Sequence, residues 1–302
     1  MADGDRERGE SVSVSGEQVV WVATGFGGST QIRAHDLEGV ELWSAETSTD
    51  LGEGGLRLHS VAAGPLTVFA GTEDYSTARM MGLDGKGEVV FEHVFKEIEH
   101  AGGVAIGSDG SLLFAGSDQD LRFRTFDEQG LQLFSDSYDH GGDEFVADAT
   151  PDPDGGYFLA AHSNNNGTPL LVRLSSDGAV EWVAPVAGRE GAQGVAADGA
   201  GGAWLALDTE LGNGGALDHY DADGNVIDTI ELGFFAQQVA IGPSGDLAVL
   251  GRDRVQRRSL DGDVIASAVI EGYWGLDMEI DAACDVYVSG SDETGAFLVK
   301  LD

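Results

Sequence analysis

Cysteine, proline and long apolar runs are scarce in this chain of 302 residues. Cys284 is the only cysteine, so no disulfide can form within the chain, and cysteine usage does not reveal the redox compartment. Proline occurs 6 times against 46 glycines, which favours tight turns and excludes a collagen-like or proline-rich segment. No stretch approaches the roughly 18 consecutive apolar residues of a membrane span, so no transmembrane segment is expected.

Positive charge is scarce as well. Lys and Arg number 16 against 53 Asp and Glu, for a formal net charge of −37 at pH 7. Such a surface repels phosphate, so we expect no nucleic-acid partner, and anionic membrane surfaces are disfavoured. Cations, basic proteins and neutral sugars remain compatible with this charge. The plainest interpretation is a solvated surface suited to solubility or high salt.

The first ten residues are charged and lack the apolar core of a signal peptide. Two localisations stay open. The protein is cytoplasmic, or it is exported or held at the cell surface of a bacterium and its signal has been trimmed. We expect residues 1–10 to form a flexible acidic segment and residues 11–302 a single domain.

A short phrase recurs at intervals of roughly 45 residues. Its clearest copies are Gly103–Gly116 and Gln238–Gly251, both containing Val-Ala-Ile-Gly followed by a polar turn and a second apolar run. Looser copies are Ser11–Gly25, Ser60–Gly71, Phe145–Ala161, Gly194–Leu207 and Asp277–Gly290. A fixed period of this size without helical periodicity predicts a β-propeller, in which each unit buries its faces against its neighbours.

The third unit shows how one repeat makes four strands. Val104–Ile106 and Leu112–Ala115 are almost wholly apolar, whereas Leu121–Phe126 alternates apolar with charged residues, and Leu131–Ser135 completes the unit. A blade needs this order, because its inner strands are buried on both faces and its outer strands on one. Asp and Gly dominate the turns, where Asp closes the turn and Gly accepts positive φ.

The sequence therefore predicts an all-β, seven-bladed β-propeller of four-stranded antiparallel blades, with six blades as the alternative. The last repeat supplies only Met278–Ile280, Asp285–Ser289 and Ala296–Leu301. We expect a three-stranded last blade, or a four-stranded one if Asp5–Glu10 pairs. Cys284 falls in a turn of this repeat, where other copies have glycine or a polar residue, which indicates a turn cysteine rather than a catalytic thiol.

The repeat resembles the bacterial propeller repeats called delta-60 and SBBP. The resemblance rests on the phrase Gly103–Gly116 and on its last copy, Ile280–Gly290 followed by Ala296–Asp302. Fourth strands that end in Trp43 and Trp182 also fit, since such repeats often carry tryptophan there. The resemblance covers nearly the whole chain and implies export or surface attachment in a bacterium, but it implies no particular activity.

Two further propeller groups are similar in part. Pyrroloquinoline-quinone propellers carry a tryptophan motif in nearly every blade; here only Trp43 and Trp182 hold that position, which indicates packing rather than a quinone site. The streptogramin lyases are similar in length, and their turns are echoed by Gly242–Gly245. They use a histidine and an acid–histidine pair near the channel, and no Glu-x-His arrangement stands at the matching place.

Candidate ligand-binding residues come from the loops that converge on one mouth of the channel. These are the loops from each fourth strand to the next first strand, together with those between second and third strands. The repeat alignment places unlike polar and aromatic residues there: Arg57, His59, His100, Asp143, Glu144, Gln193, Gln237, Trp274 and Asp277.

Three functions stay open for this mouth. The leading hypothesis is a monomeric binding propeller for a small molecule, a glycan or a protein. The alternative is a lyase, hydrolase or cyclase in which His100 pairs with Glu144 or Asp143 as general acid and base. A third interpretation is a surface protein whose acidity binds calcium loosely. We expect no organic cofactor; a divalent cation, Ca²⁺ or another, stays open, with His59, His100 and Asp277 as candidate ligands.

Overall fold

The computed structural model describes residues 7–25, 30–47, 56–73, 76–163, 167–208, 214–270, 274–292 and 295–301. Every regular element in these ranges is a β-strand. The same ranges accordingly contain no helix that is long and apolar enough to cross a membrane.

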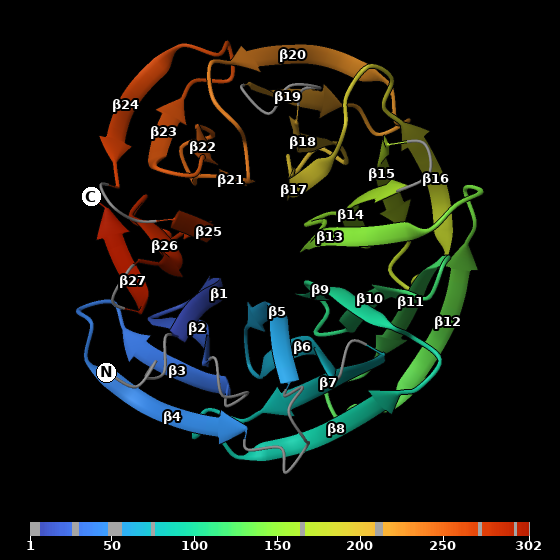
Figure 1. Ribbon diagram of the computed structural model, residues 1–302, viewed down its shortest axis with the longest axis vertical. Helices are drawn as coiled ribbons and strands as arrows, with labels where there is room; N and C mark the ends of the chain where they lie inside the picture. The colour runs from blue at the N-terminus through green and yellow to red at the C-terminus, as the bar shows by residue number, and fades with distance from the viewer. Residues whose placement is uncertain are drawn as a thin grey trace, which may run out of the picture.

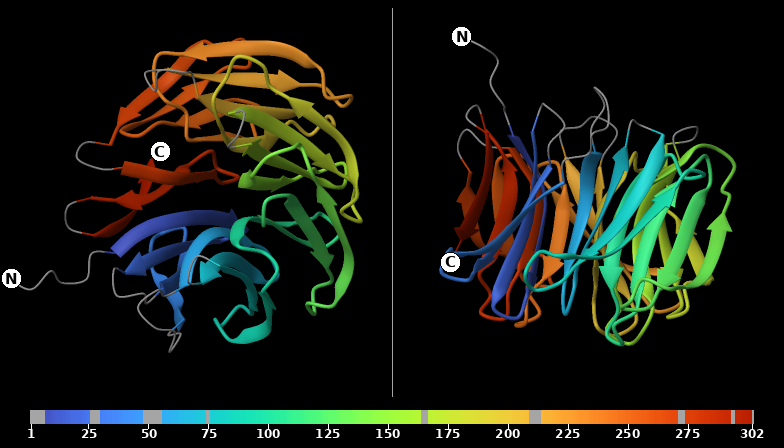
Figure 2. Two further views of the ribbon diagram at one scale, coloured as in Figure 1. Left: turned by 45° about the vertical axis from the view of Figure 1, so that its right-hand side comes forward. Right: turned by 90° about the horizontal axis from the view of Figure 1, so that it is seen from below.

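Seven antiparallel sheets stand as blades around a central axis (Figure 1). Seen from the side they form a thick disc (Figure 2). Within each sheet the strands follow sequence order, and the last sheet has three strands where the other six have four. The seven-bladed prediction and the three-stranded last blade are therefore confirmed, and the six-bladed alternative is excluded.

The blades repeat one order of strands from channel to rim. The inner strands are β1 (Glu7–Ser15), β5 (Leu56–Ala63), β9 (His100–Ile106), β13 (Glu144–Pro151), β17 (Ala192–Ala197), β21 (Gln238–Ile241) and β25 (Trp274–Ile280). The second strands are β2 (Gln18–Gly25), β6 (Thr67–Glu73), β10 (Leu112–Ser117), β14 (Tyr157–Ser163), β18 (Ala203–Asp208), β22 (Leu247–Leu250) and β26 (Val286–Ser291). The third strands are β3 (Thr30–Asp36), β7 (Thr77–Leu83), β11 (Leu121–Phe126), β15 (Thr168–Leu174), β19 (Gly215–Tyr220), β23 (Arg254–Arg258) and β27 (Ala296–Leu301). The outer strands are β4 (Glu41–Thr47), β8 (Val89–Phe95), β12 (Gln132–Tyr138), β16 (Val180–Pro185), β20 (Val226–Leu232) and β24 (Val264–Val269).

The core lies between blades, as the repeat predicts. One cluster joins Val20 and Ile32 of the first blade to Phe69 and Met81 of the second. Burial falls from channel to rim: β10 is buried at every position, whereas no residue of β12 is buried. Each blade thus depends on its neighbours for its hydrophobic stabilisation.

The two fourth-strand tryptophans pack against the next blade. A Cβ atom at Gly87 would lie 2.8 Å from the Trp43 ring, and one at Gly224 would lie 3.0 Å from the Trp182 ring. Both glycines close third-to-fourth-strand turns at positive φ, of 79° and 78°. Tryptophan and turn glycine therefore fit each other between blades, which supports the packing interpretation over a quinone site.

The ring closes by packing of the last blade on the first. β1 begins at Glu7 and pairs with β2, so residues 7–10 extend the inner strand of the first blade and do not supply a fourth strand to the last. Tyr287 of β26 joins a buried cluster with Val12, Val19 and Trp21. Hydrogen bonds from Ser11 and Val12 to a carboxylate of β25, described below, add to this closure.

Cys284 occupies a turn between β25 and β26 at φ 69°, a conformation that glycine adopts without steric cost. Its amide donates to the carbonyl of Asp281 at 3.0 Å, as the turn glycines of other blades do. We expect Cys284→Gly to stabilise the protein by about 0.5–1 kcal/mol in urea unfolding, because the left-handed strain disappears. An equal gain in Cys284→Ala would contradict this, since alanine keeps the strain and loses only the thiol.

Candidate functional site

The channel holds a cavity of about 560 Å³ to which all seven inner strands contribute. Near the mouth it is lined by Gln193, Gln237 and Leu276, and deeper by Thr150 and Glu279. This volume suits a small organic ligand, whose pockets usually measure roughly 300–1,000 Å³.

A β-bulge recurs in the inner strands and sets which side chains meet at the channel. In six of the seven blades the pairing of first and second strands skips one residue of the first strand. The residue directly after the bulge is Asp148 in the fourth blade, Gly194 in the fifth and Asp277 in the seventh. Bulges re-aim side chains, and here they place equivalent residues of successive blades on one level.

Gln238 joins two carboxylates on this level. Its Nε2 lies 3.0 Å from Oδ2 of Asp148 and 3.2 Å from Oδ1 of Asp277. To contact Asp148, the Gln238 side chain passes over the fifth blade at Gly194. A Cβ atom at Gly194 would lie 1.9 Å from Oε1 of Gln238. The absent side chain at Gly194 is therefore what lets the sixth blade contact the fourth.

Both carboxylates also accept hydrogen bonds from neighbouring blades. The amide of Val195 donates to Asp148 at 2.9 Å. Ser11 Oγ and the Val12 amide donate to Asp277 at 2.6 and 2.9 Å. Ser11 in turn accepts the amide of Val61 at 3.2 Å. A belt of hydrogen bonds thus runs from the fourth blade through the closure to the second.

The channel raises the pKa of three carboxyl groups. Burial, with the nearby charge of Asp277, raises the pKa of Glu279 to about 8 and that of Asp148 to about 7. Burial also raises the pKa of Asp277, against the opposing effect of its hydrogen bonds. All three side chains keep some surface in contact with the channel. The site can therefore hold protons near neutral pH and release them to a ligand.

Of the residues expected at the mouth, Gln193, Gln237 and Asp277 line this cavity. Sequence reasoning missed Asp148, Gln238 and Glu279. Asp148 could have been found, because it holds the same place in its repeat as Asp277. Glu279 gives no such indication, since the corresponding positions of other blades, two residues beyond the bulge level, carry mainly small side chains.

The remaining six candidates are not among the residues that line the cavity. The side chains of Arg57, His59 and Trp274 lie outside the part of the chain that the structure describes. His100 begins β9, and its ring packs 5.3 Å from the ring of Phe145. Asp143 is exposed in the loop before β13.

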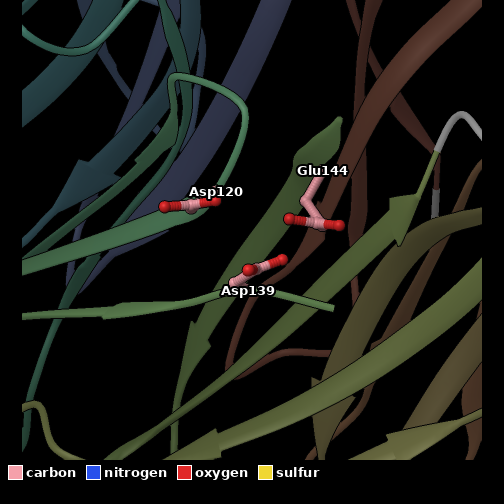
Figure 3. Close-up of side chains that lie close together, drawn as sticks. All are labelled: Asp120, Asp139 and Glu144. Atoms are coloured by element: carbon pink, nitrogen blue, oxygen red, sulfur yellow. The ribbon is translucent and has the colours of Figure 1, made fainter. Parts of the chain in front are cut away.

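Glu144 begins β13, the inner strand next to that of His100. Its side chain is 0% exposed, and neither carboxylate oxygen has a hydrogen-bond partner among the described residues. Glu144 and His100 are therefore not joined by a hydrogen bond. Burial raises the pKa of the Glu144 carboxyl, against the opposing effect of the nearby His140 backbone, which makes no hydrogen bond of normal geometry. The side chain instead faces Asp120 and Asp139, as Figure 3 shows.

Among the described residues, this trio is the group of carboxylates close enough together to hold a metal ion. His100 and Asp277, expected as metal ligands, do not belong to it. Asp277 is engaged in the belt between blades instead.

No protein-family model and no curated protein sequence matches the chain. Solved structures match its fold. A streptogramin B lyase is 15% identical with a TM-score of 0.71, and the match covers 100% of this chain and 96% of the lyase. A catalytically inactive virginiamycin B lyase from Staphylococcus aureus, crystallised with quinupristin, is 12% identical with a TM-score of 0.72, covering 99% and 96%. The WD40 propeller domain of Doa1 is 17% identical with a TM-score of 0.68, covering 99% and 93%.

These matches establish the β-propeller fold and nothing finer. At such low identity they include enzymes and WD40 domains alike, so the fold by itself does not decide between catalysis and binding. Only the residues of the channel can distinguish catalysis from binding.

Proposed function

We propose that the protein is a binding propeller whose central channel takes a small, positively charged organic molecule such as an amine. The observation that carries the proposal is the set of three carboxyl groups with raised pKa values, Asp148, Asp277 and Glu279, in one cavity. The described residues that line the cavity include no Lys, Arg or His.

A cation suits these groups better than a neutral ligand does. The fold favours protonated Glu279 at neutral pH because no Lys, Arg or His among the described lining residues compensates its charge, which only the Ile280 amide at 3.3 Å offsets. An ammonium group would supply that compensation, so binding would release a proton from Glu279. The net charge of −37 would also concentrate cations around the protein.

The amides at the mouth would add selectivity. Gln193 and Gln237 line the cavity, and Nε2 of Gln193 donates to Asp208 at 2.9 Å, which fixes its orientation. Amide groups that are held in place can distinguish ligands by their donors and acceptors at little entropic cost.

The test is calorimetric titration of the protein with spermidine at pH 7 and 150 mM NaCl, where exposed charges are largely screened. We expect saturable binding with release of a proton, detected as a heat that depends on the ionisation enthalpy of the buffer. Glu279→Gln should weaken binding at least tenfold and reduce that release to the part that Asp148 supplies, because the amide cannot become an anion.

Glu17→Gln is the matched control, since it makes the same Glu-to-Gln change at an exposed site. It should leave spermidine binding unchanged. Equal weakening by both substitutions would show binding to the acidic surface as a whole and contradict the proposal. Binding of maltose in place of spermidine would favour the glycan alternative.

One observation favours an enzyme as the second candidate. Carboxyl groups with pKa values near neutrality are suited to general acid–base catalysis, and Asp148 and Glu279 have such values in one cavity. In that case the bound amine would be consumed, and the consumption would stop in Glu279→Gln.

A further inference from the structure

We propose that Asp120, Asp139 and Glu144 form a Ca²⁺ site at the mouth, where the third blade meets the fourth. Carboxylate oxygens from the three residues lie within 4.8 Å of one another. The residues come from three segments: the β10–β11 loop, the loop after β12, and the start of β13. Figure 3 shows their carboxyl groups facing a common space.

The buried side chain of Glu144 is the strongest indication of a bound cation. It is 0% exposed, and neither oxygen accepts a hydrogen bond of normal geometry from the described residues, although the backbone of His140 lies near the carboxylate. A buried carboxylate without a partner is strongly destabilising, so folded proteins pair such groups or coordinate them to a metal. Two further acids close by would make the cost larger for an anion, and a cation would reverse it.

Each of the other two carboxylates is oriented by one neighbouring group. Oδ2 of Asp120 lies 3.2 Å from Nη2 of Arg122, and Oδ1 of Asp139 accepts the amide of Gly141 at 2.6 Å. The Glu144 amide donates to the carbonyl of Gln119 at 2.8 Å, which ties the β10–β11 loop to β13. One backbone hydrogen bond between the two blades thus joins the segments that carry Asp120 and Glu144.

The donors select a hard cation. All three are carboxylates, and the trio includes neither imidazole nor thiolate, so zinc and copper are poorly matched. Mg²⁺ demands near-ideal octahedral geometry and dehydrates reluctantly, whereas Ca²⁺ accepts irregular sets of oxygen ligands. Three carboxylates from separate segments of two blades therefore suit Ca²⁺ better.

The experiment follows the melting temperature and Ca²⁺ binding of the whole chain after EGTA treatment and dialysis. We expect wild type to bind one Ca²⁺ in isothermal titration calorimetry at 150 mM NaCl and to melt at a higher temperature with CaCl₂ than with EGTA. Glu144→Gln and Asp139→Asn should each weaken that binding at least tenfold. The same concentration of MgCl₂ should give a clearly smaller rise in melting temperature.

Asp143→Asn is the control, because Asp143 is an exposed acid next to Glu144 that lies outside the trio. It should bind Ca²⁺ as wild type does. Glu144→Gln should melt in EGTA at or above the wild-type temperature, which separates loss of the site from misfolding. The proposal is overturned if wild type binds Ca²⁺ no better than Glu144→Gln, or if Asp143→Asn loses the response equally.

Discussion

Raising the pH from 5 to 8 is expected to destabilise this protein, and Glu279→Gln is expected to remove part of that loss. The pKa of Glu279 is raised from 4.5 to about 8 in the folded state, and that of Asp148 from 3.8 to about 7. The folded protein thus binds more protons than the unfolded chain between these values. Its stability is fully present near pH 4 and falls as the pH rises through the folded-state pKa values.

Two considerations set the size of the effect. A fully desolvated group with the shift of Glu279 would destabilise the fold by about 5 kcal/mol at pH 8. Glu279 keeps contact with the channel, where water screens its charge, so we expect roughly 2 kcal/mol. Glu279→Gln should accordingly be more stable than wild type at pH 8 and about equal to it at pH 5.

Urea unfolding of both proteins at pH 5, 6.5 and 8 measures this difference. Glu17→Gln serves as the control for the general relief of charge repulsion, because it removes an exposed carboxylate. Its unfolding free energy should follow the wild-type pH dependence. Parallel pH profiles for wild type and Glu279→Gln would refute the assignment of the raised pKa to this residue.

Gly102→Ala is expected to destabilise the protein by roughly 3 kcal/mol or more. Gly102 is the bulged residue of β9, and its strand passes very close to β13. A Cβ atom there would stand 2.4 Å from Cβ of Val146 and 2.5 Å from its carbonyl oxygen. Backbone cannot yield as a flexible side chain can, so the third and fourth blades would have to separate.

The matched control is Gly233→Ala. A Cβ atom at Gly233 would meet nothing within 4 Å, and, like Gly102, this glycine is not at positive φ. The free energy of unfolding of this control should lie within about 0.5 kcal/mol of the wild-type value. Thermal and urea unfolding compare the two; a small and equal effect of both substitutions would show that the blades can move apart at little cost. Separation at this place should also weaken Ca²⁺ binding, because the proposed ligands belong to the same two blades.

The blades themselves could be predicted from the sequence. In the third blade, the apolar run at Leu112, the alternation from Leu121 and the turn at Asp127 each reflect a local rule, and the structure has strands and turns at those places. The three-stranded last blade followed from the same patterns. These features are local, because strand alternation and turn chemistry involve residues close together in sequence.

The candidate site was predictable only in part. Repeat alignment placed Gln193, Gln237 and Asp277 at the channel, since equivalent residues of equivalent blades lie at equivalent radii. It did not reveal that Gln238 reaches Asp148 across Gly194, because that contact needs a missing side chain in the blade between them. It also did not show that Glu144 turns toward Asp120 and Asp139.

The sequence by itself determined the fold class and the strongly acidic composition and favoured seven blades over six, since the repeat, the turn residues and the net charge can be read from the order of amino acids. Only the tertiary structure decided which acids share a space. Three carboxyl groups lie together in the channel, and three others lie together at the mouth. Closure of the ring sets these distances between blades, and no local sequence pattern encodes them. Those distances govern the burial of each carboxyl group, and so its pKa and the ions or ligands that it can take.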